Sequence, residues 1–134
     1  MKLVYVAGKY RDSTPFKIAA NIRVAAEVAL KWWKRNCAVI CPHMNTAFFD
    51  GEADDSVWLK GDLEMISRCD IIVMLPNWRN SHGAMVEHNV AAAEHKEIIY
   101  EECGCHCAYQ GGRWHVTPVF GSGCRESHMT ETAS

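Results

Sequence analysis

The sequence predicts a single domain of the α/β class, built on a doubly wound parallel sheet of four to five strands. Two observations lead to this prediction. Short apolar runs alternate with longer segments of helical periodicity, which is the pattern of a parallel sheet with crossover helices. The chain has 134 residues, which is enough for one hydrophobic core and too few for two ordinary domains.

The beginning of the chain predicts a strand, a helix and a second strand. Residues 3–7 are a continuous apolar run that ends at Gly8, as expected for a strand buried on both faces. A Ser or Thr cap followed by Pro15 begins a helix that extends to Asn36. The apolar face expected for this helix consists of Phe16, Ala19, Ile22, Ala26, Ala29, Leu30 and Trp33. Residues 37–41 form the second strand, and a strand–helix–strand unit of this length is a right-handed crossover that joins parallel strands.

The next segment predicts a loop, a helix and a third strand. Residues 43–54 contain the Asn, Asp and Gly that are typical of a loop. Asp55 or Ser56 can cap the helix. Its apolar face would consist of Leu59, Leu63 and Ile66. Residues 71–75 are the clearest strand in the sequence, and a proline ends it.

A third helix and a fourth strand complete the pattern. Ser81 caps the helix, which extends to His95, and residues 97–100 form the strand. Four strands that alternate with three helices predict a Rossmann-like, or flavodoxin-like, doubly wound sheet.

The end of the chain departs from this alternation. We expect residues 1–100 to be the α/β domain that carries the binding site. Residues 101–125 would be a cysteine-rich extension of the same domain, with a strand at residues 115–120. Residues 126–134 are polar and are expected to be a disordered tail.

Composition and charge exclude several classes of partner. The net charge is −2 and the sequence pI is near 6.4. No stripe of Lys and Arg is present, so a nucleic-acid polymer is not an expected partner, whereas a small molecule is. No apolar run approaches the roughly 20 residues of a membrane span. The N-terminus is too short and too soon interrupted for a signal peptide, and seven cysteines indicate a reducing compartment, so we expect a cytoplasmic protein.

Candidate site residues are found where the predicted strands end. In an open parallel sheet the ligand binds outside the carboxyl ends of the strands. This rule selects residues 8–11, 42–46 and 76–81 and the segment after Tyr100. They are rich in Arg, His, Asn, Trp and Ser, which are common in sugar, phosphate and base recognition, although loops are polar in any case. The residues expected to shape a base or sugar pocket are His43, Asn45 and an exposed Trp78.

The most informative motif is Ser81-His82-Gly83-Ala84-Met85-Val86-Glu87 at the start of the third helix. Free backbone N–H groups there would suit an anion or a sugar hydroxyl, and Gly83 leaves room for a ligand to approach the backbone. Glu87 lies one turn deeper on the same face. We expect the helix end to keep this carboxylate ionised, as a nucleophile or electrostatic stabiliser requires. A solvated Glu on a surface helix has the same spacing.

Asp62 is a second candidate carboxylate, on the second predicted helix. Paired acids are the usual equipment for cleaving a glycosidic bond. A solvated Asp on an amphipathic helix is the alternative, and Asp70, at the entry of a strand, has a structural role. The first strand is followed by neither a Gly-x-Gly-x-x-Gly motif nor a Walker loop, which disfavours dehydrogenases and P-loop enzymes.

The cysteine-rich end allows a different interpretation. Its potential zinc ligands are Cys103, Cys105, His106, Cys107, His115, Cys124 and His128. The Cys-x2-Cys pairing of structural zinc sites is missing. Strand alternation would also place the first three thiols on one face without any metal, so we assign no metal ligand here.

Three segments together resemble the nucleoside 2-deoxyribosyltransferase superfamily, which includes deoxynucleoside 5′-monophosphate N-glycosidases. They are Val4-Tyr5-Val6-Ala7-Gly8, Gly61-Asp62-Leu63 running to Asp70, and Ser81-x-Gly83-x-x-x-Glu87. The resemblance covers about residues 1–100 and is closest to small uncharacterised bacterial and phage members. His82, His88 and the cysteine-rich end depart from the familiar pattern.

The resemblance implies roles for individual residues. Glu87 would be the nucleophile at the anomeric carbon, Asp62 would assist at the base or sugar, and Tyr5 would lie near the nucleophile. Ser81 and Arg11 would contact a 5′-phosphate, which favours a nucleotide over a nucleoside. Members in which one subunit completes its neighbour's site imply a homo-oligomer, a dimer or higher.

The sequence therefore predicts an enzyme that cleaves an N-glycosidic bond or transfers a deoxyribosyl group, on a nucleoside or its 5′-monophosphate. Glu87, Asp62 and Tyr5 form the expected catalytic group, and Gly8, Arg11, Ser81 and Gly83 join the pocket residues in binding substrate. No cofactor is expected, because a protonated base is a workable leaving group. A non-catalytic nucleotide sensor of the same fold and a zinc-stabilised interaction protein are the alternatives.

Overall fold

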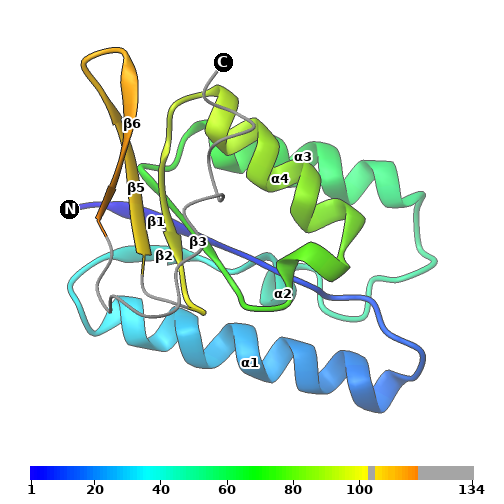
Figure 1. The fold of residues 1–134 in the computed structure, drawn as a ribbon. Helices are drawn as coiled ribbons and strands as arrows, with labels where there is room; N and C mark the ends of the chain where they lie inside the picture. Colours follow the sequence, from blue (N-terminus) through cyan, green and yellow to red (C-terminus); the bar gives the residue numbers. More distant parts are fainter. Residues whose placement is uncertain (103–104, 118–134) are drawn as a thin grey trace.

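A six-stranded sheet forms the centre of the computed structural model, which describes residues 1–102 and 105–117 (Figure 1). The strand order is β2-β1-β3-β4-β5-β6. The first four strands are parallel, and β5 and β6 are antiparallel additions at the β4 edge. The strands are β1 (Leu3–Ala7), β2 (Ala38–Ile40), β3 (Ile71–Met74), β4 (Glu97–Tyr100), β5 (Cys105–Gln110) and β6 (Arg113–Thr117).

Helices cover both faces of the sheet, so the doubly wound prediction is confirmed (Figure 1). On one face α1 (Pro15–Trp33) packs through Ala25 and Ala29 against Val6 and Leu75. On the other face lie α3 (Asp55–Ser67) and α4 (His82–Ala93), whose buried residues contact Tyr5, Ile72 and Ile98. None of the helices in the described part of the chain is long and apolar enough to cross a membrane.

The helix caps follow the sequence closely. The Thr14 side chain accepts a hydrogen bond from the Lys17 backbone N–H at 3.2 Å, and the Ser81 hydroxyl accepts one from Ala84 at 3.2 Å. The cap of α3 is Asp54 rather than Asp55 or Ser56. Any of these three side chains can satisfy a free N–H at a helix start, and the sequence alone does not rank them.

One prediction about a connecting segment was wrong, and two helices end earlier than predicted. The loop expected at residues 43–54 begins with a short helix, α2 (Pro42–Asn45), because Pro42 is pre-organised for a helical first turn. The segment after β3 contains a short 3₁₀ helix, η1 (Trp78–Asn80). The first helix ends at Trp33 and α4 at Ala93, somewhat before the predicted ends.

The sheet is wider than expected because the chain after Tyr100 turns back as a hairpin. Gly111 and Gly112 connect β5 to β6, with φ of 60° and 81° that suit glycine. The strand predicted at residues 115–120 begins earlier, at Arg113, and its last three residues lie outside the described part. Cys105 and Cys107 share one buried face of β5, while Cys103 and the tail predicted at residues 126–134 are not described.

The apolar face predicted for the first helix was wrong in part, since Ala29 is buried as expected but other members of that face are exposed. Phe16 is 85% exposed, and Leu30 and Trp33 are 54% and 53% exposed. The sheet contacts Ala25 and Trp32 beside Ala29, because two alanines let the helix axis approach the strands closely. Both stripes contain apolar residues at helical spacing, so periodicity could not distinguish them.

Gly8 has a packing role that its sequence position did not reveal. A Cβ atom at Gly8 would lie 2.5 Å from Cδ1 and 2.7 Å from Cβ of Leu75. The chain leaving β1 therefore touches the chain leaving β3, and this contact needs a residue without a side chain. Gly61, inside α3, has no such neighbour within 4 Å.

Substitution of Gly8 and Gly61 by alanine should change the free energy of unfolding in opposite directions. Gly8→Ala is expected to destabilise the protein by about 1–3 kcal/mol, because the new methyl group overpacks Leu75. Gly61→Ala should stabilise it by about 0.5–1 kcal/mol, because alanine loses less entropy in a helix. Urea unfolding of both variants measures the difference, and a neutral Gly8→Ala variant would contradict the contact.

Candidate active site

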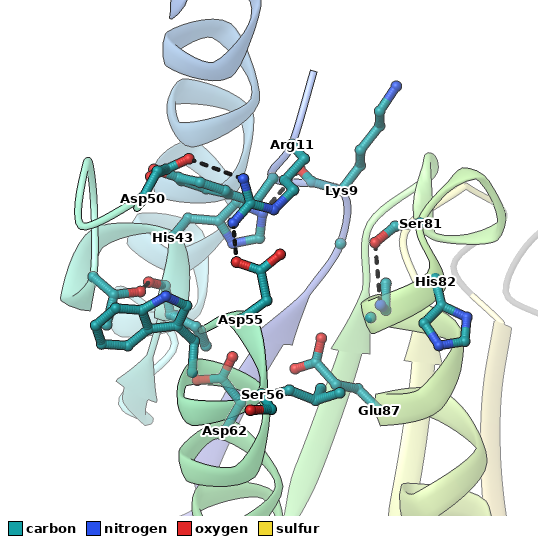
Figure 2. Close-up of a pocket in the computed structure, with 18 of the residues that line it drawn as sticks. Lys9, Arg11, His43, Asp50, Asp55, Ser56, Asp62, Ser81, His82 and Glu87 are labelled. Atoms are coloured by element: carbon teal, nitrogen blue, oxygen red, sulfur yellow. Dashed lines mark hydrogen bonds and ion pairs between the residues drawn. The ribbon is translucent and has the colours of Figure 1, made fainter. Parts of the chain in front are cut away.

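A cavity of about 530 Å³ opens at the carboxyl ends of β1 and β3, between α3 and α4 (Figure 2). This volume is in the usual range for a small-molecule site. Residues 8–11, the start of α2, the loop before α3, one side of α3 and the beginning of α4 line it. Three of the four segments selected from strand ends thus contribute residues. The segment after Tyr100 contributes none among the residues that the structure describes.

Tyr5 and Glu87 meet at the floor of this cavity. Tyr5 lies in β1 on the face that α3 and α4 cover, and Glu87 lies in the second turn of α4. The Tyr5 hydroxyl donates a hydrogen bond to Oε2 of Glu87. Glu87 is only 7% exposed and lines the cavity, while Tyr5 is fully buried behind it. Two residues that are 82 positions apart in the sequence, one in a central strand and one in a helix, therefore hold the Glu87 carboxyl in place.

Burial dominates the protonation of Glu87. It raises the pKa of this carboxyl to about 8, although the hydrogen bond from Tyr5 acts in the opposite direction. The prediction that the helix end keeps Glu87 ionised was wrong. Its carboxyl lies a full turn inside the helix, where the dipole of the helix end is weak and desolvation is strong.

Asp62 faces Glu87 across the cavity. It comes from α3, and Figure 2 shows the two carboxyls turned toward the same space from opposite helices. Burial raises the pKa of Asp62 to about 6, and the charge on Asp62 contributes to the raised pKa of Glu87. Near neutral pH the pair therefore carries one proton, which lies mainly on Glu87 because its pKa is the higher of the two.

The start of α4 lines the opposite wall. Ser81 uses its hydroxyl as an acceptor for the Ala84 N–H. A Cβ atom at Gly83 would have one neighbour within 4 Å among the described residues, the Ser81 Oγ at 4.0 Å. Protein packing therefore does not require glycine at position 83, and the space beside it belongs to the cavity.

His43 lies at the back of the cavity. Burial lowers its pKa, so the ring is neutral. Its Nε2 is 3.0 Å from the Lys9 carbonyl oxygen, which can only accept, so the proton is on Nε2. Nδ1 is then an acceptor, and it has no hydrogen-bond partner in the described part of the chain.

Arg11 occupies the cavity mouth between two carboxylates. Its guanidinium pairs with Asp50 at 3.4 Å and also with Asp55. Asp50 additionally accepts a hydrogen bond of 2.7 Å from the Tyr10 hydroxyl. These contacts connect three separate segments at the rim of the cavity (Figure 2).

The sequence reasoning missed several lining residues, of which Asp50, Asp55 and Trp58 matter most for the site. Asp50 and Asp55 were assigned only to a loop and a helix cap. Trp58 is half-buried, lines the cavity and contacts the Phe49 ring at a centroid distance of 5.7 Å. It lies four residues before Asp62 in the same helix, so the i, i+4 spacing could have identified it.

Two predicted pocket residues do not line the cavity. Trp78, expected to be exposed, is 7% exposed and stacks on His88 at a centroid distance of 4.3 Å. The short helix η1 turns it into the core. Asn45 contacts the Met65 sulfur at 4.0 Å instead.

The structure offers no support for a zinc site in its described part. No three His, Cys, Asp or Glu side chains within residues 1–102 and 105–117 could hold a metal ion together. Of the candidate ligands, Cys103, Cys124 and His128 lie outside the described residues.

A family model and several solved structures match this chain. The model described as Domain of unknown function (DUF4406) matches residues 2–100. A 2-deoxyribosyltransferase from Bacillus psychrosaccharolyticus is 18% identical, over 73% of this chain and 70% of that one, with a TM-score of 0.54. None of the curated proteins compared with the sequence matches it.

Two further structures extend the likeness. A 2-desoxiribosyltransferase from Leishmania mexicana is 21% identical, over 75% of this chain and 63% of that one, with a TM-score of 0.52. A CMP N-glycosidase from Clostridium botulinum is 21% identical, over 74% of this chain and 70% of that one, with a TM-score of 0.51. The predicted fold, that of the nucleoside 2-deoxyribosyltransferase superfamily, is thus confirmed.

The buried carboxyl of Glu87 should lower stability at alkaline pH. In the unfolded chain it ionises near pH 4.5, whereas folding holds it protonated up to about pH 8. The stability that this neutral group contributes is therefore complete below pH 4.5 and is lost as the pH rises to 8. Glu87→Gln is expected to gain at least about 1 kcal/mol over the wild type at pH 8, and almost nothing at pH 4.5. Thermal unfolding across this range measures the gain.

Glu94→Gln provides the matched control, because Glu94 is exposed near the end of the same helix. Its difference from the wild type should not vary with pH in the way expected for Glu87→Gln. An equal gain for Glu87→Gln at both pH values would contradict the raised pKa.

Proposed function

This chain belongs to the DUF4406 family, and we propose that it cleaves the N-glycosidic bond of a nucleoside or nucleoside 5′-monophosphate, or transfers the sugar to a second base. The observation that carries the proposal is a buried carboxyl, Glu87, which accepts a hydrogen bond from Tyr5 and faces Asp62 in a cavity large enough for a small molecule. The fold shared with two deoxyribosyltransferases and a CMP N-glycosidase supports the same reaction class.

In the first step Glu87 acts as the nucleophile. A carboxylate oxygen bonds to C1′ of the sugar while the C1′–N bond breaks, and the electron pair of that bond leaves with the base. The form that reacts is the one in which the single proton of the pair has moved from Glu87 to Asp62, and Asp62 gives this proton to the departing base. A glycosyl ester on Glu87 and an ionised Asp62 result.

In the second step an acceptor removes the sugar. Water bonds to C1′, the ester bond to Glu87 breaks, and Asp62 takes the proton from the water. Both carboxyls return to their starting states, and the products are the free sugar and the base. A second base in place of water gives transfer. Neither step is an oxidation or a reduction, so we propose no cofactor.

The neighbouring side chains support this assignment of roles. The Tyr5 hydroxyl donates a hydrogen bond to Glu87, which stabilises the ionised carboxylate. Trp58 provides an aromatic surface beside Asp62, against which the planar base of a substrate can stack. The free backbone N–H groups near Ser81 and Gly83 suit sugar or phosphate oxygens.

Base release is the direct test of the reaction. Purified protein incubated with deoxynucleosides and their 5′-monophosphates should release free base from at least one of them. Glu87→Ala should lower this rate by ~10³-fold or more, because the nucleophile is lost. Chromatography of the free bases measures the rate.

The alternatives give different results. Binding without release from any substrate would favour the sensor and exclude the enzyme. Undiminished release by Glu87→Ala would remove Glu87 from the mechanism while leaving the reaction class intact. Glu94→Gln should release base at the wild-type rate.

The pH profile should show the proton shared by the two carboxyls. Below about pH 6 both are protonated and Glu87 cannot attack, and above about pH 8 both are ionised and the base leaves unprotonated. The kcat/KM profile should therefore be bell-shaped with a maximum near pH 7. Tyr5→Phe removes a hydrogen bond that lowers the pKa of Glu87. The alkaline limb should move to higher pH, and the maximum should fall about tenfold or more.

Tyr109→Phe is the control for this variant. Tyr109 stacks on His95 at a centroid distance of 3.6 Å, away from the cavity. Its pH profile should match that of the wild type. A Tyr5→Phe profile with unshifted limbs would show that Tyr5 does not tune Glu87.

A further inference from the structure

We propose that the cavity takes a nucleoside with a free 5′-hydroxyl and discriminates against its 5′-monophosphate. The inference rests on the proposed function and narrows its substrate class. It departs from the expectation that Arg11 binds a phosphate. The charges at the rim of the cavity carry it.

Both Lys and Arg side chains that line the cavity already have carboxylate partners. Lys9 Nζ is 3.5 Å from Asp12. Arg11 pairs with Asp50 at 3.4 Å and with Asp55 on its other side. A phosphate could reach the guanidinium only by competing with two ionised groups that would remain beside it.

The net charge of the lining is unfavourable for an anion. Its carboxyls are Asp50, Asp55, Asp62 and Glu87. With Glu87 protonated and the two lining histidines, His43 and His82, counted as neutral, three negative charges oppose two positive ones. A phosphate monoester adds about 1.5 to 2 negative charges near neutral pH. Salt screens charges that are partly exposed, so this repulsion is strongest at low ionic strength.

The start of α4 does not reverse this balance. A helix N-terminus contributes only about half a positive charge. The Ser81 hydroxyl already accepts the Ala84 N–H. The N–H groups left near Gly83 can donate to a neutral hydroxyl oxygen as well as to a phosphate.

The acidic rim suits hydroxyl donors. Asp50 is fixed by Tyr10 and Arg11, and Arg11 also holds Asp55, whose side chain is 66% exposed. Figure 2 shows these groups on the wall of the cavity that also carries Asp62. Carboxylate oxygens with free lone pairs accept hydrogen bonds from sugar hydroxyls. Arg11 is thus a positioning residue that orders two acceptors.

The test compares each deoxynucleoside with its own 5′-monophosphate on the wild-type protein. We expect kcat/KM for base release to be at least tenfold higher for the nucleoside at low ionic strength, and the ratio to shrink as salt screens the rim. A monophosphate that is used as well as the nucleoside, or better, overturns the inference while the proposed function stands.

If no base is released, equilibrium binding tests the preference for a nucleoside independently of the proposed reaction. Isothermal titration of the same pairs then decides the inference without turnover. Tighter binding of the nucleoside supports it. Equal or tighter binding of the monophosphate, or no binding of either, overturns it. The binding comparison can therefore be made even if the protein does not catalyse base release.

Neutralising the rim should reduce the discrimination. Asp50→Asn and Asp55→Asn together keep the shape of the side chains and leave Arg11 without carboxylate partners. The nucleoside-to-monophosphate ratio should fall at least fivefold through better use of the monophosphate. Glu52→Gln removes one charge from the same loop outside the cavity lining and should leave the ratio unchanged. An equal fall in both variants would assign the effect to overall charge and overturn the role of the rim.

Discussion

The contact between Tyr5 and Glu87 constrains the rest of the candidate site. A carboxyl that is 7% exposed is stable in the core only if it has a hydrogen-bond donor or is protonated, and here both conditions contribute. The donor comes from the central strand β1, so α4 must lie over that strand at one fixed position. The cavity forms where α4 and α3 then leave the strand ends uncovered.

Burial alone accounts for most of the increase in the pKa values of Glu87 and Asp62. Glu87 and Asp62 approach one cavity from two helices, and burial disfavours the charge on each. Full ionisation of both would add repulsion to desolvation. A pair that shares one proton can offer a nucleophile and an acid together, which is what the proposed reaction requires.

The charged groups at the rim of the cavity differ from those at its floor in that they are partly exposed and paired with one another. Arg11, Asp50 and Asp55 are partly exposed, and ion pairs of this kind contribute little to stability. Their effect is on the charge and order of the cavity mouth. They connect the segment after β1, the loop before α3 and the first turn of α3. The buried pair, Glu87 and Asp62, therefore bears on the class of reaction, whereas the charged rim bears on which substrate is accepted.

The sequence by itself determined the four parallel strands, two helix caps and the motif that contains Glu87. These features depend on local periodicity and on residue types that end or begin an element. The tertiary structure decided which apolar stripe of α1 faces the sheet, that Trp78 is buried while Trp58 lines the cavity, and that Arg11 is held by Asp50 and Asp55. It also decided that Glu87 has a raised pKa. Each of these depends on burial or on contacts between residues far apart in the chain, and spacing along one segment contains no information about either.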